Sequence, residues 1–229
     1  MLTLAIDTAT KICSVALCKD REVLAEYTIN RGMTHSEGLL PQLEQLFTRS
    51  GISKKEIELL AVSMGPGSFT GLRIGLATAE AMAYAFKVYI HGVNTLKALA
   101  YNLPVDGAVL SPVIDAQKGN YYQAIYKWEG GVLRELMPLA VVKAAKVLEN
   151  MAGTGCDVVL LGECAKLIKN GLPAFVKTVP DHLALPRASS VAFAAMAEFD
   201  PAADRKIFGL EPYYIRRSEA EELWEKKHA

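Results

Sequence analysis

The stretch Ser63-Met64-Gly65-Pro66-Gly67-Ser68-Phe69-Thr70-Gly71-Leu72-Arg73-Ile74-Gly75 decides the fold of this chain. An apolar run at 59–62 precedes it and predicts a buried strand, and residues 72–86 predict a long helix after it. A strand, a glycine-rich turn and a helix together point backbone N–H groups at one place, where an anion can bind. No Gly-Lys-Ser/Thr follows at the required spacing, so the turn is not a P-loop. The alternative is a structural turn that Ser68 or Thr70 caps.

The predicted helix carries a strip of small residues at every fourth position: Gly71, Gly75, Ala79 and Ala83. Such a strip lets another helix approach closely, as is best known from membranes. Arg73, Glu80 and Lys87 interrupt the apolar run, so a membrane-spanning segment is not expected. The strip therefore either packs inside its own domain or forms a surface for another chain.

Composition limits the function classes. The 229 residues suffice for one large domain or two small ones, and 51% of them are hydrophobic, so a sizeable core is possible. The formal net charge is zero, which gives no strong field that would attract nucleic acid. The four cysteines form no C-x-x-C pair and the start of the chain does not read as a signal peptide, so we expect a cytoplasmic location.

The order of predicted elements repeats in two halves. In the first half, strands at 2–7, 12–18 and 23–29 precede a helix that opens at the capping box of Thr34 and Glu37 and stops at Gly51. In the second half, strands at 109–115, 121–128 and 132–137 precede a helix at about 140–151 and a strand at 158–161. Asp7 then corresponds to Asp115, and Gly65 to Gly162.

Two β-β-β-α-β-α halves predict an α/β protein of the actin/Hsp70/sugar-kinase superfold. We expect an N-terminal lobe at 1–104 that carries the glycine turn, and a C-terminal lobe at 105–229. A charged helix at 218–227 ends the second lobe and is expected to pack back on the first.

The chain offers few residues for catalysis. None of its four histidines lies four positions from another or beside a cysteine, so no local metal site is expected. Ser68 lies in a strand-to-helix turn, but the G-x-S-x-G spacing of a nucleophile elbow fails. Asp7 and Asp115 each end a predicted strand, where a carboxylate faces a cleft or hydrogen-bonds its own turn. For Asp115 we favour the turn, and for Asp7 both alternatives stay open.

Several motifs, in order, resemble the bacterial TsaB (YeaZ) family over essentially the whole chain. They are 7–10 (DTAT) with 14–16 (SVA), 35–37 (HSE) with 40–41 (LP), 65–75 (GPGSFTGLRIG), 114–116 (IDA) with 121–122 (YY), and 212–216 (PYYIR). The long glycine motif is specific, whereas the others are weak singly.

The resemblance implies a function. The family's paralogue TsaD carries a metal-binding His pair and transfers a threonylcarbamoyl group to the tRNA adenosine beside the anticodon. TsaB-type proteins lack that pair and act as non-catalytic partners of TsaD, which the ATPase TsaE joins. The rival functions are a glycoprotease-type peptidase or a small ATPase, and a self-associating scaffold is a third possibility.

The resemblance also implies sites. The family's heterodimer contact is a helix bundle, which matches the helices at 35–47 and 71–86 and also serves for homodimers. The expected partner-facing residues are His35, Glu37, Leu39, Leu43, Leu46, Gly71, Gly75, Ala79 and Ala83. No metal or cofactor is expected on the lone chain, and tRNA is contacted only through the complex. ATP or ADP is expected at most at the complex interface, near Asp7, Thr8, Thr10, Gly65, Gly67 and Ser68.

Overall fold

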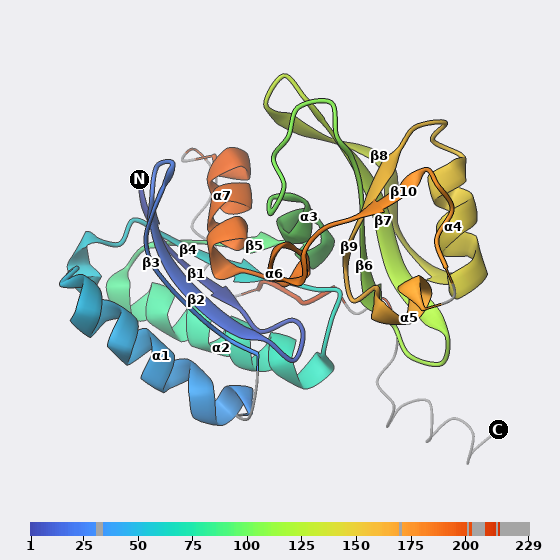
Figure 1. Cartoon of the computed structure of the whole chain (residues 1–229). Coiled ribbons are helices and arrows are strands. Elements are labelled where there is room, and N and C mark those ends of the chain that lie inside the picture. The colour runs from blue at the N-terminus through green and yellow to red at the C-terminus, as the bar shows by residue number, and fades with distance from the viewer. Residues whose placement is uncertain (31–33, 170, 201, 203–208, 214, 216–229) are drawn as a thin grey trace, which may run out of the picture.

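The computed structural model describes residues 1–30, 34–169, 171–200, 202, 209–213 and 215. Two lobes lie side by side, each built on a five-stranded sheet (Figure 1). The strands are β1 (Leu2–Asp7), β2 (Cys13–Lys19), β3 (Glu22–Ile29), β4 (Leu59–Ser63), β5 (Tyr89–Val93), β6 (Val109–Asp115), β7 (Asn120–Glu129), β8 (Val132–Lys143), β9 (Val158–Gly162) and β10 (Val176–Thr178). The helices are α1 (His35–Ser50), α2 (Phe69–Phe86), α3 (Thr95–Ala100), α4 (Ala144–Ala152), α5 (Ala165–Ile168), α6 (Asp181–Ala184) and α7 (Ala188–Glu198), with a 3-10 turn at Lys54–Glu56.

The first sheet has the order β3-β2-β1-β4-β5. β1 pairs with β2 antiparallel and with β4 parallel, and β4 pairs with β5 parallel. β1 and β4 are buried along their whole length, which explains why both are short continuous apolar runs rather than alternating ones. The predicted strand before the glycine turn is thus confirmed as β4, an interior strand of the sheet.

The second sheet, in the order β8-β7-β6-β9-β10, repeats the strand directions of the first. This repetition confirms the predicted actin/Hsp70/sugar-kinase superfold with its two similar halves. Asp7 and Asp115 are the last residues of the equivalent strands β1 and β6. Gly162 pairs with Val113, as Ala61 pairs with Ala5, so the predicted match between Gly162 and Gly65 is wrong.

The two halves exchange helices. α1 and α2 cover one face of the first sheet, while α7 covers the other face and contacts β1, β2 and β4. α3 instead packs against β6 and β7, and α3 and α7 lie between the two sheets (Figure 1). The predicted boundary at 104 separates the strands of the two sheets, but the helices cross it. That 1–104 and 105–229 are separate domains stays a prediction, and the helix predicted at 218–227 lies outside the described residues.

The small-residue strip packs inside its own lobe. Ala79 and Ala83 are fully buried in the core between α2 and the first sheet, and Gly71 and Gly75 lie against Thr8 at the end of β1. The strip therefore lets α2 approach its own sheet, and the expectation that it faces another chain is corrected. The same correction applies to Leu39, Leu43 and Leu46, which fill this core from α1 with at most 4% exposure.

One predicted boundary is wrong. β8 continues to Lys143, because residues 140–143 pair with Asn120–Gln123 of β7, so α4 begins at Ala144 and not near Ala140. The start of α1 is as predicted. The Glu37 carboxylate accepts one hydrogen bond from the Thr34 N–H at 3.2 Å and another from the Thr34 hydroxyl at 2.8 Å. Gly51 ends the helix in the left-handed conformation.

Candidate functional site

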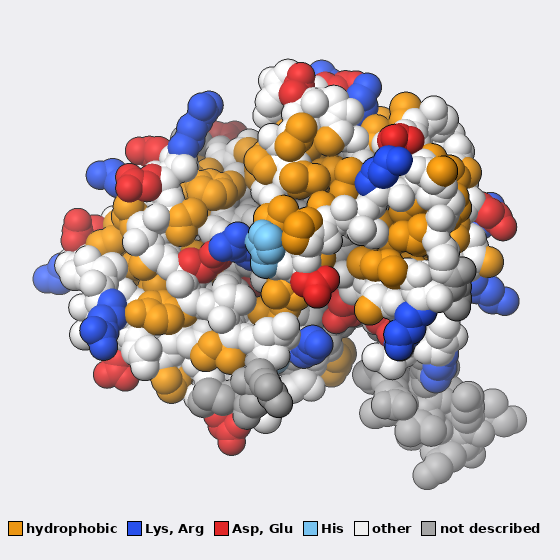
Figure 2. Space-filling model, viewed as in Figure 1, with side chains coloured by type: hydrophobic (Ala, Val, Ile, Leu, Met, Phe, Trp, Pro, Cys, Tyr) orange, Lys and Arg blue, Asp and Glu red, His pale blue; other side chains and the backbone are white. Residues whose placement is uncertain are grey.

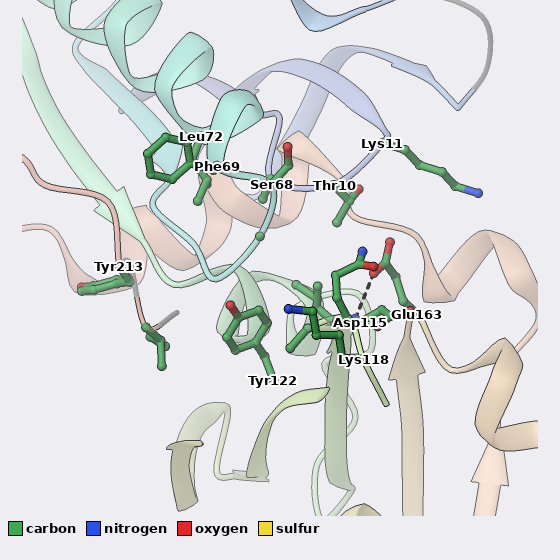
Figure 3. A pocket seen from close by; sticks show the side chains of 16 residues that line it. Thr10, Lys11, Ser68, Phe69, Leu72, Asp115, Lys118, Tyr122, Glu163 and Tyr213 are labelled. Carbon is green, nitrogen blue, oxygen red and sulfur yellow. Dashed lines mark hydrogen bonds between the residues drawn. The ribbon is translucent and has the colours of Figure 1, made fainter. Parts of the chain in front are cut away.

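A cavity of about 670 Å³ lies between the lobes, beside the N-terminus of α2 (Figure 3). One wall comes from the β1–β2 turn and the glycine turn, and the opposite wall from the β6–β7 turn and the end of β9. Its lining residues are Ala9, Thr10, Lys11, Gly67, Ser68, Phe69, Leu72, Ile114, Asp115, Ala116, Gln117, Lys118, Tyr122, Glu163, Tyr213 and Ile215.

The cavity contains three of the six residues predicted near a nucleotide. Thr10, Gly67 and Ser68 line it, whereas Asp7, Thr8 and Gly65 do not, so the prediction is corrected for the latter three. Thr8 is fully buried and its hydroxyl donates to the Gly71 carbonyl at 2.8 Å. Gly65 lies against the backbone of Tyr213 and adopts a positive φ of 102°.

The Asp7 side chain is buried beneath the β1–β2 turn. Its side chain is 1% exposed, and Oδ1 accepts hydrogen bonds from the Ala9 N–H at 2.9 Å and the Ser63 hydroxyl at 3.1 Å. Burial raises the pKa of this carboxyl above its usual value, and the hydrogen bonds and His35 only partly oppose the shift. Asp7 therefore organises its own turn, the alternative that the sequence left open.

The glycine motif seats the β1–β2 turn on α2. A Cβ at Gly67 would lie 2.1 Å from the Ala9 carbonyl oxygen, and one at Gly71 would lie 2.1 Å from the Thr8 carbonyl oxygen. At Gly75 it would lie 2.2 Å from the Thr8 hydroxyl oxygen. Each of these contacts is closer than real Cβ atoms approach, so the four-residue spacing of these glycines is a packing requirement.

This packing leaves no room for phosphates between the two turns. The Ser68 N–H, which would point at an anion, donates to the Ala9 carbonyl oxygen at 2.6 Å. The Ser68 hydroxyl caps α2 by accepting the Gly71 N–H at 3.2 Å. The actin-like superfold implies a nucleotide here, but these residues do not fit its phosphate groups.

The polar end of the cavity belongs to the second lobe. Asp115 accepts the Gln117 N–H at 2.8 Å, the turn role favoured from sequence, and pairs with Lys166 at 2.6 Å. Glu163 accepts the Asp115 N–H at 3.0 Å, and burial together with the Asp115 charge raises its pKa. Glu163 could not be predicted as a site residue from the sequence, since only the sheet topology brings the end of β9 beside the end of β6.

The other end is apolar. Phe69 and Leu72 approach from α2, Tyr122 from β7, and Tyr213 from the C-terminal segment (Figure 3). The Tyr213 N–H donates to the Met64 carbonyl oxygen at 2.7 Å, which ties residues 209–213 to the end of β4. Nothing in the local sequence of the motif at 212–216 predicts that Tyr213 lines this cavity.

His35 and Glu37, which were both predicted to face a partner chain, have different surroundings in the structure. The His35 side chain is half-buried, and its Nε2 donates to the Thr10 carbonyl oxygen at 2.7 Å. Its ring also lies against Gly71, so His35 holds the β1–β2 turn, and its role in a partner surface stays a prediction. Glu37 is exposed on the first turn of α1, where a role in a partner surface stays a prediction.

The outward face of α1 and α2 has its own apolar pattern. Leu40 is 63% exposed and Tyr84 65% exposed. Ala77, Ala81 and Ala85 form a second small-residue strip on α2, two positions from the buried one, and all three are exposed. We refer to Leu40, Ala77, Ala81, Tyr84 and Ala85 as the outer helix face.

Charges are mixed on the face seen in Figure 2, where acidic and basic side chains alternate over both lobes. Within the described ranges, no group of three or more His, Cys, Asp or Glu side chains is placed to hold a metal ion. Among those same residues, no helix is both long and apolar enough to cross a membrane.

The chain matches a known protein family over most of its length. The family model "TsaD: tRNA N6-adenosine threonylcarbamoyltransferase" matches residues 22–224. The chain is 32% identical to the tRNA threonylcarbamoyladenosine biosynthesis protein TsaB of Bacillus subtilis, with 98% of each chain covered. It is 38% identical to the protein of the same name from Escherichia coli, with 71% of each chain covered.

Solved structures support the fold. A Pseudomonas aeruginosa protein described as similar to peptidase YEAZ superimposes with a TM-score of 0.76 at 24% identity, covering 93% of this chain and 98% of that one. YeaZ from the same organism gives a TM-score of 0.71 at 24% identity, covering 86% and 92%. The ethanolamine utilization protein EutJ of Carboxydothermus hydrogenoformans gives 0.54 at 13% identity, covering 85% and 90%.

Proposed function

This chain belongs to the TsaB (YeaZ) family, and we propose that it is a non-catalytic subunit that pairs with a TsaD-type protein. The observation that carries the proposal is the similarity to TsaB of Bacillus subtilis over 98% of both chains. The names of these relatives support a role in the biosynthesis of threonylcarbamoyladenosine in tRNA. In this proposal the protein works in the cytoplasm and meets tRNA only through the complex.

The described residues support a non-catalytic role. His35 donates to the Thr10 carbonyl oxygen, and His91, which does not line the cavity, lies 3.2 Å from Glu198 of α7. Ser68 caps a helix, so it is not a nucleophile held by a base. A glycoprotease-type peptidase or a small ATPase is the alternative function, and neither has its machinery in the cavity.

The outer helix face is the proposed docking surface for the TsaD-type partner. Exposed alanines at 77, 81 and 85 let a partner helix approach α2 closely, and Leu40 on α1 and Tyr84 on α2 supply large exposed apolar side chains. The TsaD family model matches residues 22–224 of this chain, and we expect the partner to share its fold and to offer an equivalent helix pair. The same face serves a homodimer when the partner is absent.

Two more partners complete the proposal. The ATPase TsaE joins the pair, and ATP or ADP binds at the junction of the subunits. The lone chain holds no nucleotide tightly, since its two turns are closed on each other.

A titration with the TsaD-type protein of the same organism, read as mass in solution, tests the proposal. We expect a one-to-one heterodimer, and modification of tRNA only when both proteins and TsaE are present. Peptidase activity of this chain alone, or persistent separation of the two proteins at micromolar concentrations, would overturn the proposed function.

A further inference from the structure

Helix α1 carries a proline in its interior, which is unusual for an α-helix. Pro41 has no N–H, so it cannot donate to the carbonyl oxygen of Glu37 four residues earlier, as the residue at this position does elsewhere in a helix. Glu37 and Pro41 are both exposed. The carbonyl oxygen that lacks its α-helical hydrogen bond therefore lies on the solvent side of α1.

Pro41 belongs to an exposed ridge with an acidic residue at each end. Glu37, Leu40, Pro41 and Glu44 are spaced by three and four residues, which places them on one face of α1. We refer to these four residues as the acidic ridge. The ridge includes Leu40 of the outer helix face, and α1 and α2 lie side by side on the first sheet (Figure 1). It is therefore continuous with the proposed docking surface.

We propose that the acidic ridge receives a basic helix of the TsaD-type partner. Lys or Arg side chains of that helix pair with the carboxylates of Glu37 and Glu44, and one of them donates to the Glu37 carbonyl oxygen. The two glutamates are seven residues apart, about 10 Å along the helix, so the partner needs basic residues at a matching separation. The inference rests on the proposed function, because it names the chemistry of the helix that occupies the docking surface.

Charge complementarity provides the first argument. Glu37 and Glu44 are the acidic residues of α1, and both lie on the ridge. Arg49 lies in the last turn of α1, where a basic side chain suits the C-terminal end of a helix, and it is five residues beyond Glu44 and off the ridge. Opposite charges across an interface select the correct partner and accelerate its association. An acidic ridge therefore selects a basic helix.

The backbone provides the second argument. The Glu37 carbonyl oxygen points along the helix axis towards the Pro41 ring, which cannot bond it. Lys and Arg are the donors that form the stronger, charge-assisted hydrogen bonds with oxygen. A partner helix that covers Leu40 and the Pro41 ring removes water from this oxygen, and the bond is electrostatically stronger in the drier environment. The proline thus presents an acceptor that a regular helix would keep for itself.

Association of the full chain with the TsaD-type protein, read as mass in solution at about 50 mM and about 500 mM salt, tests the charges. Glu44→Lys should weaken association at least about tenfold at low salt and less than about threefold at high salt, because salt screens exposed charges. Glu149→Lys makes the same change at an exposed position on α4 and should stay within about twofold at both salt concentrations. Equal affinities of these two variants would overturn the proposal.

Glu37→Gln provides a second test of the charges if Glu44→Lys lowers the melting temperature. Glutamine keeps the capping box with Thr34, so this variant removes the charge and leaves the start of α1 intact. It should weaken association about threefold to tenfold at low salt. An affinity equal to that of the unchanged chain would overturn the pairing assigned to Glu37.

Pro41→Ala tests the carbonyl. The variant should raise the melting temperature of the lone chain, because alanine restores the missing N–H and favours the helix. It should also weaken association about fivefold, because the Glu37 carbonyl is then bound within α1. Pro104→Ala, at an exposed loop position, is the matched control and should not weaken association. A higher melting temperature with the affinity of this control would show a merely structural role and overturn the role of the carbonyl.

Ala81→Arg, measured on the same samples, keeps this inference apart from the proposed function. A heterodimer that Ala81→Arg weakens and the ridge variants do not would overturn the acidic ridge and uphold the docking surface. If the unchanged chain forms no heterodimer, both proposals fall. If Glu44→Lys alters the mass of the lone chain and leaves the heterodimer unchanged, the ridge faces a second copy, which would overturn the basic partner helix.

Discussion

Gly75 illustrates how single residues set the geometry of the site. In a helix interior, glycine is less favourable than alanine by roughly 1 kcal/mol, so a glycine at this position needs a reason. The Thr8 hydroxyl supplies it, since it donates to the Gly71 carbonyl directly above Gly75. The sequence predicted a close approach at this strip but not the side of the helix that is approached, because spacing does not distinguish a sheet from a partner helix.

Gly75→Ala should destabilise the protein by about 1–3 kcal/mol, as overpacking of a core does, despite the better helix propensity of alanine. Chemical denaturation measures the change. In a Thr8→Ala background the same substitution should cost much less, because the atom 2.2 Å from the new Cβ is gone. Equal costs in the two backgrounds would show that Thr8 is not the obstacle.

Asp7 makes stability depend on pH. Its folded pKa is raised above the usual 3.8, so the native state binds the proton more tightly than the unfolded chain does. The stabilisation is therefore complete below about pH 4 and is lost as pH rises through the raised pKa.

Asp7→Asn should remove this dependence while Oδ1 still accepts from Ala9 and Ser63. Relative to the unchanged protein, the variant should gain stability as pH rises from 4 to 8, measured by urea unfolding at each pH. A difference that is flat with pH would mean that Asp7 titrates alike in the folded and unfolded states.

At the scale of elements, α2 carries small residues on two sides, one packed against the first sheet and the other exposed. Ala79 and Ala83 face the first sheet, and Ala77, Ala81 and Ala85 face outward. The helix, its cap and one strip could be predicted from the sequence, but the surface predicted for that strip is wrong, because both faces of α2 are rich in small residues. The boundary between β8 and α4 was missed for a similar reason, since alanine and valine at 140–142 suit either element.

A pair of substitutions on α2 separates its two faces. Ala79→Leu should lower the stability of the lone chain by about 1–3 kcal/mol through overpacking, and Ala81→Leu should change it by less than about 0.5 kcal/mol. Thermal unfolding of both variants provides the comparison. Similar melting temperatures for the two would show that Ala79 is not packed against the first sheet.

At the scale of the molecule, a part-buried carboxylate fastens α7, which follows the second sheet in the sequence, to the first sheet. Glu26 on β3 accepts from Arg187 at 2.8 Å and from the Ser189 N–H at 3.0 Å, at the N-terminus of α7. The duplication and the fold class could be predicted from the repeated pattern of apolar runs. The exchange of α3 and α7 could not, because the contact between Glu26 and Arg187 joins residues 161 positions apart.

Glu26→Ala should cost about 1–3 kcal/mol, since it leaves the Ser189 N–H and the Arg187 guanidinium without their acceptor. Hydrogen exchange should show faster opening of α7 than of α1. Glu149→Ala removes an exposed ion pair with Lys146 and is the matched control, expected within about 0.5 kcal/mol. A Glu26→Ala variant as stable as this control would rule out a role of Glu26 in holding α7.

Association with the TsaD-type partner through the outer helix face is the central claim, and one measurement tests it most directly. Mass in solution is recorded for mixtures of the partner with the unchanged chain, with Ala81→Arg and with Ala145→Arg, an exposed alanine on α4. We predict a heterodimer for the unchanged chain and for Ala145→Arg, and at least hundredfold weaker association for Ala81→Arg with an unchanged melting temperature. A heterodimer of equal affinity with Ala81→Arg would contradict the account.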